Sequence, residues 1–381
     1  MKKLATVLGC GLVGATMARE LAADEQYIVT AVDASAENLK RLAGIPRLAA
    51  RQVDLADAER LRAAIADADV VLGALPSRMG LHTLEAVIRA GKPYGDISFM
   101  PEDALALDKL AKQHKTTTVV DCGVSPGLSN MMVGYADARL DRADRAEILV
   151  GGLPKARHWP YQYKAPFAPS DVIEEYVRPA RMRENGRLVV KPALSEPELI
   201  DVPGVGSLEA FNTDGLRSLL TTVDISDLRE KTLRYPGHIE LMRVLRDTGY
   251  FSSDPIDIRG APVRPLDVTA KLLFPKWKLD EGEAEFTFLR VVVEGVKDDR
   301  RMRHSFELFD EYDPVRRMSS MARTTGFPCV IVAKMLAEGR LSEYGVNPPE
   351  NIARLPGVFE HVVLELRARG VRITQTVEQV A

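Results

Sequence analysis

The first 130 residues alternate between short apolar runs and longer segments in which apolar residues recur every three or four positions. "LATVLG", "YIVTAVD" and "DVVLGALPS" are apolar on both faces, as in parallel strands that are covered by helices. "DAERLRAAIADA" and "GLHTLEAVIRAG" have helical spacing. This alternation predicts a doubly wound α/β domain with a parallel sheet.

The pattern changes between about Val133 and Asp313, where strand-like runs follow one another without regular helices between them. "RAEILVGGL", "RLVVKPA" and "AEFTFLRVVVEG" read as strands, and "RHSFELFDEYD" should pair with the last of these across "VKDDRRM". We expect this part to form an open mixed sheet. Two late segments, "MARTTGFPCVIVAKMLAEG" and "FEHVVLELRARG", have helical apolar stripes.

A glycine-rich joint connects the first expected strand to the first expected helix. It has the spacing Gly9-x-Gly11-x-x-Gly14, which permits a tight turn, close approach of backbone to a pyrophosphate, and close helix–strand packing. The helix N-terminus then offers free N–H groups to phosphate. The same N-terminal stretch has the lysines and apolar run of a secretory signal, but the glycine spacing favours the strand–turn–helix interpretation.

An acidic residue ends the second expected strand. Asp33 lies 19 residues after Gly14, where a carboxylate accepts hydrogen bonds from the adenosine ribose and repels a 2′-phosphate. We therefore expect NAD as the cofactor in preference to NADP. Lys40 and Arg41 follow closely and leave phosphate binding open, and Asp33 could also act only as a helix cap.

Ligands of doubly wound folds collect at the carboxyl ends of the strands. We expect Asp54 and Leu55 beside the adenine, and Asp96 and Asp121 near the nicotinamide. The full set of candidate cofactor-binding residues is Gly9, Gly11, Leu12, Val13, Gly14, Asp33, Asp54, Leu55, Leu75, Pro76 and Cys122. Strand-end aspartates also cap helices, so each carboxylate alone is an ambiguous signal.

Composition narrows the possible partners. The net charge of −3 argues against nucleic acid or an anionic membrane as the main partner, and no apolar run is long enough to span a bilayer. Three widely separated cysteines suit a reducing cytoplasm and exclude a disulfide framework or a CxxC metal knuckle. Nothing in the sequence supports a metal site.

From "DCGVSPGLSNMM" onward the chain resembles the saccharopine dehydrogenase-like superfamily. "GGLP", "YKAPFAPSDVIEEYVRPAR", "FNTDGLRSLL", "KTLRYPGH" and "MARTTGFPCVIVAKML" are most similar to the L-lysine 6-dehydrogenases within it, and the resemblance covers nearly the whole chain. It implies a Rossmann domain (1–130) that is interrupted by an α/β catalytic and dimerisation domain (131–315), with residues 316–381 returning as helices to the first domain. It also implies a homo-oligomer, a dimer or higher.

The resemblance implies that NAD accepts hydride from the carbon that bears the ε-amine of L-lysine. Hydrolysis of the imine then releases ammonia and 2-aminoadipate 6-semialdehyde, which cyclises. This chemistry requires the carbon within about 3–3.5 Å of the nicotinamide and an amine in its neutral form. The other end of lysine requires a cation for its carboxylate and an acid or a carbonyl for its α-ammonium.

The segment from Tyr161 to Arg181 is rich in tyrosine, proline and charge, makes poor core, and is expected to line the amino-acid site. Tyr163 and Lys164 are catalytic candidates, with Lys164 lowering the pKa of the substrate amine. Arg178 or Arg181 could bind the carboxylate, and Glu174 or Glu175 the α-ammonium, although Ser170 could start a helix with an exposed acidic face.

A second group of candidates follows in "FNTDGLRSLL" and "KTLRYPGH". Asp214 and Arg234 are substrate-binding candidates, and His238 has the ordinary pKa for proton transfer near neutrality. Asp96 and Asp121 compete with His238 for the role of general base. Cys122 is expected to pack behind the cofactor.

Three other interpretations remain open. A saccharopine-forming or -cleaving enzyme would need more cations, which Lys155, Arg157, Arg217 and Arg234 could supply. An opine- or polyamine-type dehydrogenase would use NADPH. A non-catalytic module would only sense NAD through its glycine loop.

Overall fold

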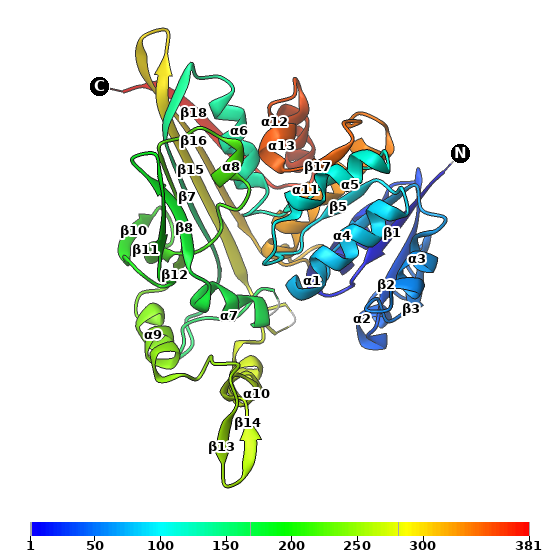
Figure 1. Cartoon of the computed structure of the whole chain (residues 1–381), viewed down its shortest axis with the longest axis horizontal. Helices are drawn as coiled ribbons and strands as arrows, with labels where there is room; N and C mark the ends of the chain where they lie inside the picture. Colours follow the sequence, from blue (N-terminus) through cyan, green and yellow to red (C-terminus); the bar gives the residue numbers. More distant parts are fainter. Residues whose placement is uncertain (1, 168, 281, 381) are drawn as a thin grey trace. The chain divides into compact units, whose positions relative to one another are not determined.

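The computed structural model describes residues 2–167, 169–280 and 282–380, which fold into two compact units. The first unit comprises Met1–Arg139 and Met321–Ile373, and the second comprises Leu140–Ser320 and Thr374–Ala381. Figure 1 colours the chain from one end to the other and labels its elements. Each unit has its own sheet.

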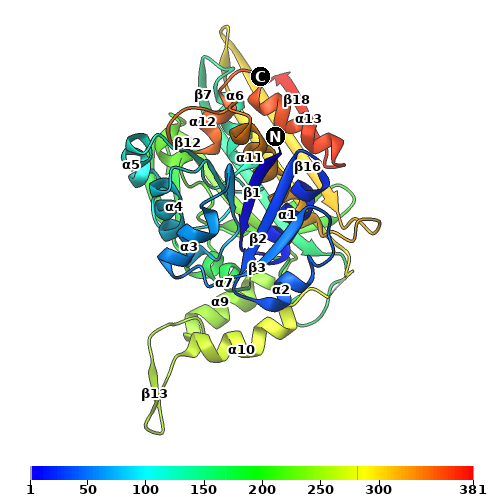
Figure 2. The ribbon, with the colours of Figure 1, turned by 90° about the vertical axis from the view of Figure 1, so that its right-hand side faces the viewer.

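The first unit is built on a seven-stranded sheet whose pairs are parallel, in the order β17-β6-β5-β4-β1-β2-β3. Figure 2 shows β1, β2 and β3 side by side. The strands are β1 (Lys3–Leu8), β2 (Tyr27–Asp33), β3 (Leu48–Gln52), β4 (Val70–Gly73), β5 (Tyr94–Asp96), β6 (Thr117–Val119) and β17 (Gly345–Asn347).

The helices of the first unit pack with this sheet, some through one apolar side and others buried almost all round. They are α1 (Leu12–Ala23), α2 (Ala36–Lys40), α3 (Ala58–Ile65), α4 (Gly80–Arg89), α5 (Asp108–Gln113), α6 (Leu128–Asp137), α11 (Ser320–Ala337, in this unit from Met321), α12 (Pro349–Ala353) and α13 (Val358–Ala368), with short 3₁₀ turns η1 (Ser77–Met79) and η2 (Ala104–Leu107). Leu61, Leu84 and Val87 pack with strand residues such as Val71 in one buried cluster.

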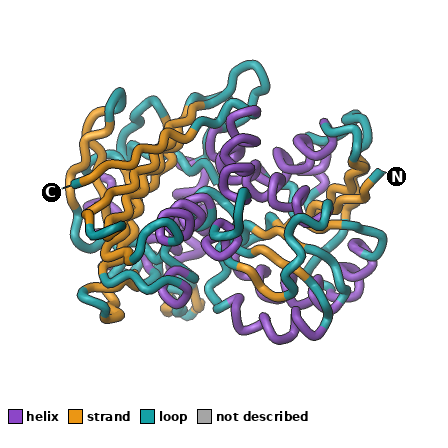
Figure 3. The backbone as a smooth tube through the Cα atoms, turned by 90° about the horizontal axis from the view of Figure 1, so that it is seen from above, coloured by secondary structure: helices purple, strands orange, loops and turns teal. Residues whose placement is uncertain are grey.

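The second unit is built on a nine-stranded mixed sheet. Its main path is β10-β11-β12-β7-β15-β16-β18, with β8 paired to β12 and β9 paired to β8. Figure 3 shows its long strands as extended orange segments. The strands are β7 (Arg142–Pro154), β8 (Ala180–Glu184), β9 (Arg187–Lys191), β10 (Glu198–Val202), β11 (Gly206–Asn212), β12 (Asp227–Arg234), β15 (Glu285–Lys297), β16 (Arg300–Glu311) and β18 (Ile373–Gln379).

A second core in this unit joins most of its helices to the sheet. The helices are α7 (Pro169–Val177), α8 (Leu219–Thr222), α9 (His238–Thr248) and α10 (Pro265–Trp277). Tyr163, Tyr176, Phe211, Met242 and Trp277 are buried together there. A two-stranded hairpin, β13 (Ile256–Ile258) with β14 (Ala261–Val263), projects beyond α10 in both Figures 1 and 2.

The expected fold class is confirmed, since a parallel doubly wound sheet and a mixed sheet are both present. The expected hairpin is present as β15 paired with β16. Two segments differ in placement from the expected domain limits: residues 131–139 stay with the first unit, and β18 joins the second sheet. Among the described residues, no helix has the length and hydropathy needed to span a membrane.

Candidate functional site

The glycine loop of the first unit turns from β1 into α1. Gly9 has φ +85°, and a Cβ there would lie 2.4 Å from the Ala74 carbonyl oxygen. A Cβ on Gly14 would lie 1.9 Å from the carbonyl oxygen of Gly9. A Cβ on Gly11 would meet no heavy atom within 4 Å. Gly9 and Gly14 therefore permit the turn itself, whereas Gly11 leaves open space at the start of α1.

Asp33 fixes this loop at the end of β2. Its carboxylate accepts hydrogen bonds from the backbone N–H groups of Cys10 (2.6 Å) and Ser35 (2.7 Å) and from the Asn38 side-chain amide (3.2 Å). Burial, with the nearby charge of Asp33, raises the pKa of Cys10 to about 12, so its thiol stays protonated. The acid thus lies against the glycine loop.

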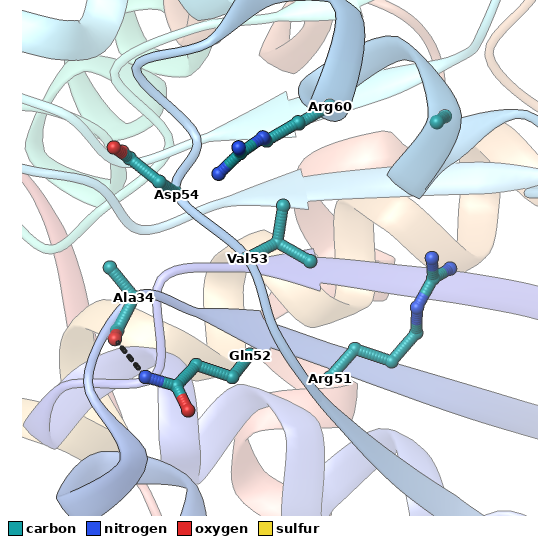
Figure 4. Close-up of a pocket in the computed structure, with 7 residues that line it drawn as sticks. Ala34, Arg51, Gln52, Val53, Asp54 and Arg60 are labelled. Atoms are coloured by element: carbon teal, nitrogen blue, oxygen red, sulfur yellow. Dashed lines mark hydrogen bonds between the residues drawn. The ribbon is translucent and has the colours of Figure 1, made fainter.

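A cavity of about 500 Å³ follows the ends of β2 and β3 and is drawn in Figure 4. Its lining residues are Ala34, Arg51, Gln52, Val53, Asp54, Arg60 and Ala63. In Figure 4 the Arg60 side chain points toward Asp54, whereas Arg51 points away from it. Leu55 does not line this cavity and is buried in the core of the unit.

The remaining candidate cofactor contacts differ in exposure. Leu12 is 46% exposed at the start of α1 and Pro76 is also exposed, whereas Val13 and Leu75 are partly buried. Cys122 is fully buried, and its backbone N–H donates to the Asp96 carbonyl at 2.7 Å.

Asp96 is a fully buried carboxyl at the end of β5. It accepts hydrogen bonds from the Tyr94 hydroxyl at 2.9 Å and from the Ser98 hydroxyl. Burial raises the pKa of Asp96 to about 7, although both hydroxyls oppose the shift and the charge of Asp121 adds to it. Asp121 is 5% exposed and has φ +50°. Both of these candidate bases are therefore enclosed within the first unit.

The second unit brings together four of the candidates from distant parts of the chain. Arg234 donates to the Glu175 carboxylate at 2.6 Å, and its guanidinium carbon lies 4.4 Å from the ring centroid of Tyr163. The Tyr163 and His238 rings have centroids 5.0 Å apart. Tyr163, Arg234 and His238 are each at most 2% exposed.

His238 does not titrate near neutrality, contrary to expectation. Burial and the charge of Arg234 lower its pKa to about 3. Its ring nitrogens lie 2.8 Å from the Tyr161 carbonyl oxygen and 2.9 Å from the Tyr176 hydroxyl. The neutral ring is thus a fixed member of a hydrogen-bonded chain.

Lys164 lies in a different group. Its ammonium binds Glu283 at 3.0 Å and Asp280 at 3.2 Å, and these partners raise its pKa although burial opposes them. These residues line a cavity of about 440 Å³ together with Lys155 and His158. Lys164 is therefore held in its charged form by two acids, and its expected effect on the pKa of the substrate amine stays a prediction.

The remaining substrate candidates form internal ion pairs. Arg181 holds Asp214 with two parallel bonds of 2.9 Å, and Arg178 lies 3.4 Å from Glu174. Asp214 is 5% exposed, so its carboxylate is largely occupied by Arg181.

Three residues of this region were missed from the sequence. Tyr176 links Arg234 to His238, and Trp277 packs edge-on to Tyr163 at 5.7 Å. Glu230 is 2% exposed and accepts from Thr213 and Gly215, and burial raises its pKa to about 7. Tyr176 lies within the segment from Tyr161 to Arg181 that the sequence singled out, whereas Glu230 and Trp277 lie outside the quoted motifs.

Comparison with family models covers most of the chain. Residues 5–119 match the saccharopine dehydrogenase NADP binding domain, and residues 123–371 match the saccharopine dehydrogenase C-terminal domain.

Curated relatives have similar names. Saccharopine dehydrogenase (NADP(+), L-glutamate-forming) of Pyricularia oryzae is 22% identical over 92% of this chain and 94% of that protein. The Saccharomyces cerevisiae protein of the same name is 22% identical over 96% of this chain and 97% of its own length. Alpha-aminoadipic semialdehyde synthase of Arabidopsis thaliana is 27% identical over 55% of this chain, which corresponds to only 21% of that longer protein.

Among solved structures, apo saccharopine dehydrogenase (L-Glu forming) from Saccharomyces cerevisiae superposes with a TM-score of 0.79. It is 18% identical and covers 100% of both chains, so it shows the shared fold. The family models together span both units of this chain. The chain therefore belongs to the saccharopine dehydrogenase family and is a dehydrogenase-type oxidoreductase with a nicotinamide dinucleotide-binding domain.

Proposed function

We propose that this protein is an NAD-dependent dehydrogenase that oxidises a carbon–nitrogen bond of a lysine-derived amino acid, with saccharopine as the first candidate substrate. The observation that carries the proposal is the match of a dinucleotide domain (5–119) and a saccharopine dehydrogenase C-terminal domain (123–371) on one chain. The relatives that align over nearly their whole length are named as saccharopine dehydrogenases.

The glycine loop fits a dinucleotide. A Cβ on Gly11 would meet no heavy atom within 4 Å. The N-terminus of α1 points its free N–H groups toward this space, as a pyrophosphate requires. When bound, NAD would supply the acceptor for a hydride. We assign the pyrophosphate to Gly9, Gly11 and Gly14 and the adenosine to the cavity beside Asp54.

Asp33 supports NAD in preference to the NADP(+) that is named for the fungal relatives. A carboxylate at the end of β2 can accept from the ribose hydroxyls and repels a 2′-phosphate. Arg51 and Arg60 line the neighbouring cavity, and as cations they do not repel a 2′-phosphate. Discrimination against NADP therefore depends mainly on Asp33.

L-lysine is the second candidate substrate, and the pairing of the cations favours it. Saccharopine carries additional carboxylates that need cationic partners. Of the cations expected to supply them, Lys155 pairs with Glu311 and Arg234 with Glu175, and the Arg157 guanidinium lies 4.1 Å from the ring centroid of Tyr235. A substrate with one carboxylate, such as L-lysine, needs fewer cationic partners in the site than saccharopine does.

One spectrophotometric experiment separates these possibilities. The purified protein is incubated with saccharopine or L-lysine, each with NAD or NADP, and the absorbance of the reduced cofactor is followed. Turnover of saccharopine with NAD supports the main proposal, and turnover of L-lysine alone supports the second. Faster turnover with NADP than with NAD would overturn the cofactor assignment, and NAD binding without turnover of any amine would favour a sensing module.

A further inference from the structure

A chain of hydrogen bonds with a fixed direction runs through the buried core between α7 and α9. His238 Nδ1 lies 2.8 Å from the Tyr161 carbonyl oxygen, which can only accept, so Nδ1 carries the ring proton. The neutral ring then presents Nε2 as an acceptor, and the Tyr176 hydroxyl donates to it at 2.9 Å. The Tyr176 oxygen in turn accepts from Arg234 Nε at 3.2 Å. Each of these hydrogen bonds therefore has only one possible donor.

Arg234 ends this chain and holds Glu175. One terminal nitrogen, Nη2, donates to Glu175 Oε2 at 2.6 Å, and the other donates to the Leu233 carbonyl at 2.9 Å. The guanidinium also lies over the Tyr163 ring, with 4.4 Å between Cζ and the ring centroid. Arg234 is only 2% exposed, so a substrate does not reach it directly.

Glu175 is the part of this assembly that a ligand can reach. Its side chain keeps 19% exposure, against 2% for Arg234. Within residues 2–167, 169–280 and 282–380, only Oε2 of its two oxygens has a hydrogen-bond partner. Burial raises the pKa of Glu175, whereas the charge and the hydrogen bond of Arg234 act in the opposite direction and favour the carboxylate form. An ammonium group is the natural partner for the second oxygen.

We propose that Tyr176 and His238 are positioning residues that hold Arg234 against Glu175, so that Glu175 Oε1 binds the α-ammonium group of the substrate. The amino-acid nature of this ligand rests on the proposed function. His238 serves here as a fixed hydrogen-bond acceptor. Its lowered pKa suits this role because the ring stays neutral. Arg234 acts through Glu175 and does not contact the substrate carboxylate.

Ligand binding can be followed without turnover because the chain has two tryptophans. Trp277 is fully buried with its ring centroid 6.3 Å from that of Tyr176, whereas Trp159 is 84% exposed. In a W159F background, fluorescence therefore reports on this cluster alone. The probes are L-norleucine, which has an α-ammonium group, and N-acetyl-L-norleucine, which lacks it.

The first test replaces the carboxylate with its uncharged isostere. We expect E175Q to weaken L-norleucine binding and raise the KM of the amino-acid substrate about tenfold or more, with kcat within about twofold, because a charge-assisted hydrogen bond is lost. N-acetyl-L-norleucine should bind weakly to both proteins. The control is E240Q, since Glu240 is a 75% exposed carboxylate on α9 that should change neither value. Unchanged L-norleucine affinity in E175Q would overturn the proposal.

The second test separates the two nitrogens of His238. The amide of H238Q reaches the position of Nε2 and keeps an acceptor for Tyr176, whereas H238N keeps a donor near Nδ1 for Tyr161. We expect H238Q to retain L-norleucine affinity within about threefold, and H238N and Y176F to lose about tenfold. Equal affinities in H238Q and H238N would count against the positioning role.

The two proposals can fail separately. If neither saccharopine nor L-lysine is oxidised, the proposed function fails, but the L-norleucine titrations of E175Q and Y176F still decide the ammonium site. If an amine is oxidised and E175Q leaves its KM unchanged, only the ammonium site is rejected.

Discussion

The candidate sites of the two units are built in different ways. In the first unit, the loop between β1 and α1 depends on close backbone approaches at Gly9 and Gly14. In the second unit, Glu175, Arg234 and His238 come from α7, β12 and α9 and meet through side chains. A site made of local backbone can be identified from residue spacing, whereas a site made of side chains requires the fold.

The acidic side chains of the two sites are also held in place by different groups. Asp33 is fixed by two backbone N–H groups of neighbouring turns, so no cation is needed to hold it. Glu175 is fixed by Arg234, a buried cation that would itself be costly without a partner. Removing one residue should therefore disturb only neighbouring residues in the first unit, but residues from several elements in the second.

The backbone site should show the largest effect on stability. In G14A the new Cβ would lie 1.9 Å from the Gly9 carbonyl oxygen, so we expect the free energy of unfolding to fall by about 3 kcal/mol. The matched control is G11A, whose Cβ meets nothing within 4 Å and which should change that free energy by less than about 0.5 kcal/mol. Urea denaturation measures both. G11A should instead weaken NADH binding, measured by fluorescence, and equal losses of stability in the two variants would contradict this account.

The side-chain site should show the next largest effect. R234M leaves the Glu175 carboxylate partly buried without its cation, and we expect a loss of about 2 kcal/mol, because the 19% exposure of Glu175 lets water relieve part of the penalty. The double variant R234M/E175M removes both charges and should be more stable than R234M. If the double variant is less stable than the single one in urea, the ion pair is not the reason for the loss.

Among the described residues, burial raises the pKa of one carboxyl in each unit to about 7, that of Asp96 in the first and that of Glu230 in the second. Both acids titrate near 4 in the unfolded chain, so the folded state retains protons that the unfolded state releases. Their stabilisation is complete below about pH 4 and is lost as the pH rises through about 7, at up to about 1.4 kcal/mol per pH unit for each group.

D96N and E230Q should each reduce this decline in the free energy of unfolding. The measurement is urea denaturation at several values between about pH 4.5 and pH 7.5. An unchanged slope in either variant would show that its carboxyl is already ionised in the folded protein. Because the two acids lie in different units, the two reductions should add.

The smallest effect concerns the choice of cofactor. D33A removes the carboxylate that the ribose would meet, so we expect NAD affinity to fall about tenfold and discrimination against NADP to relax. D54A, which alters the neighbouring cavity without a contact to the glycine loop, should preserve the preference for NAD. Titration with NADH and NADPH checks both, and an unchanged preference in D33A would remove Asp33 from the ribose.

Much of the first unit could be predicted because its signals are local. Apolar runs gave β1, β2 and β4, and the glycine spacing located the turn before α1. The partners of Lys164 could not be predicted, because Glu283 and Asp280 lie over 100 residues away in the chain and fold back onto its ammonium group. The titration expected for His238 was wrong because neither its burial nor the charge of Arg234 can be read from "RYPGH".

The sequence by itself determined the parallel sheet, the glycine turn and the acid that follows the second strand, because periodicity and spacing act over a few residues. Only the tertiary structure decided which charges are neutralised, which carboxyls keep their protons and which side chains form the chain from Tyr161 to Glu175. Those properties depend on burial and on the distances between groups far apart in sequence, since both desolvation and Coulomb interaction are set by the surroundings in space.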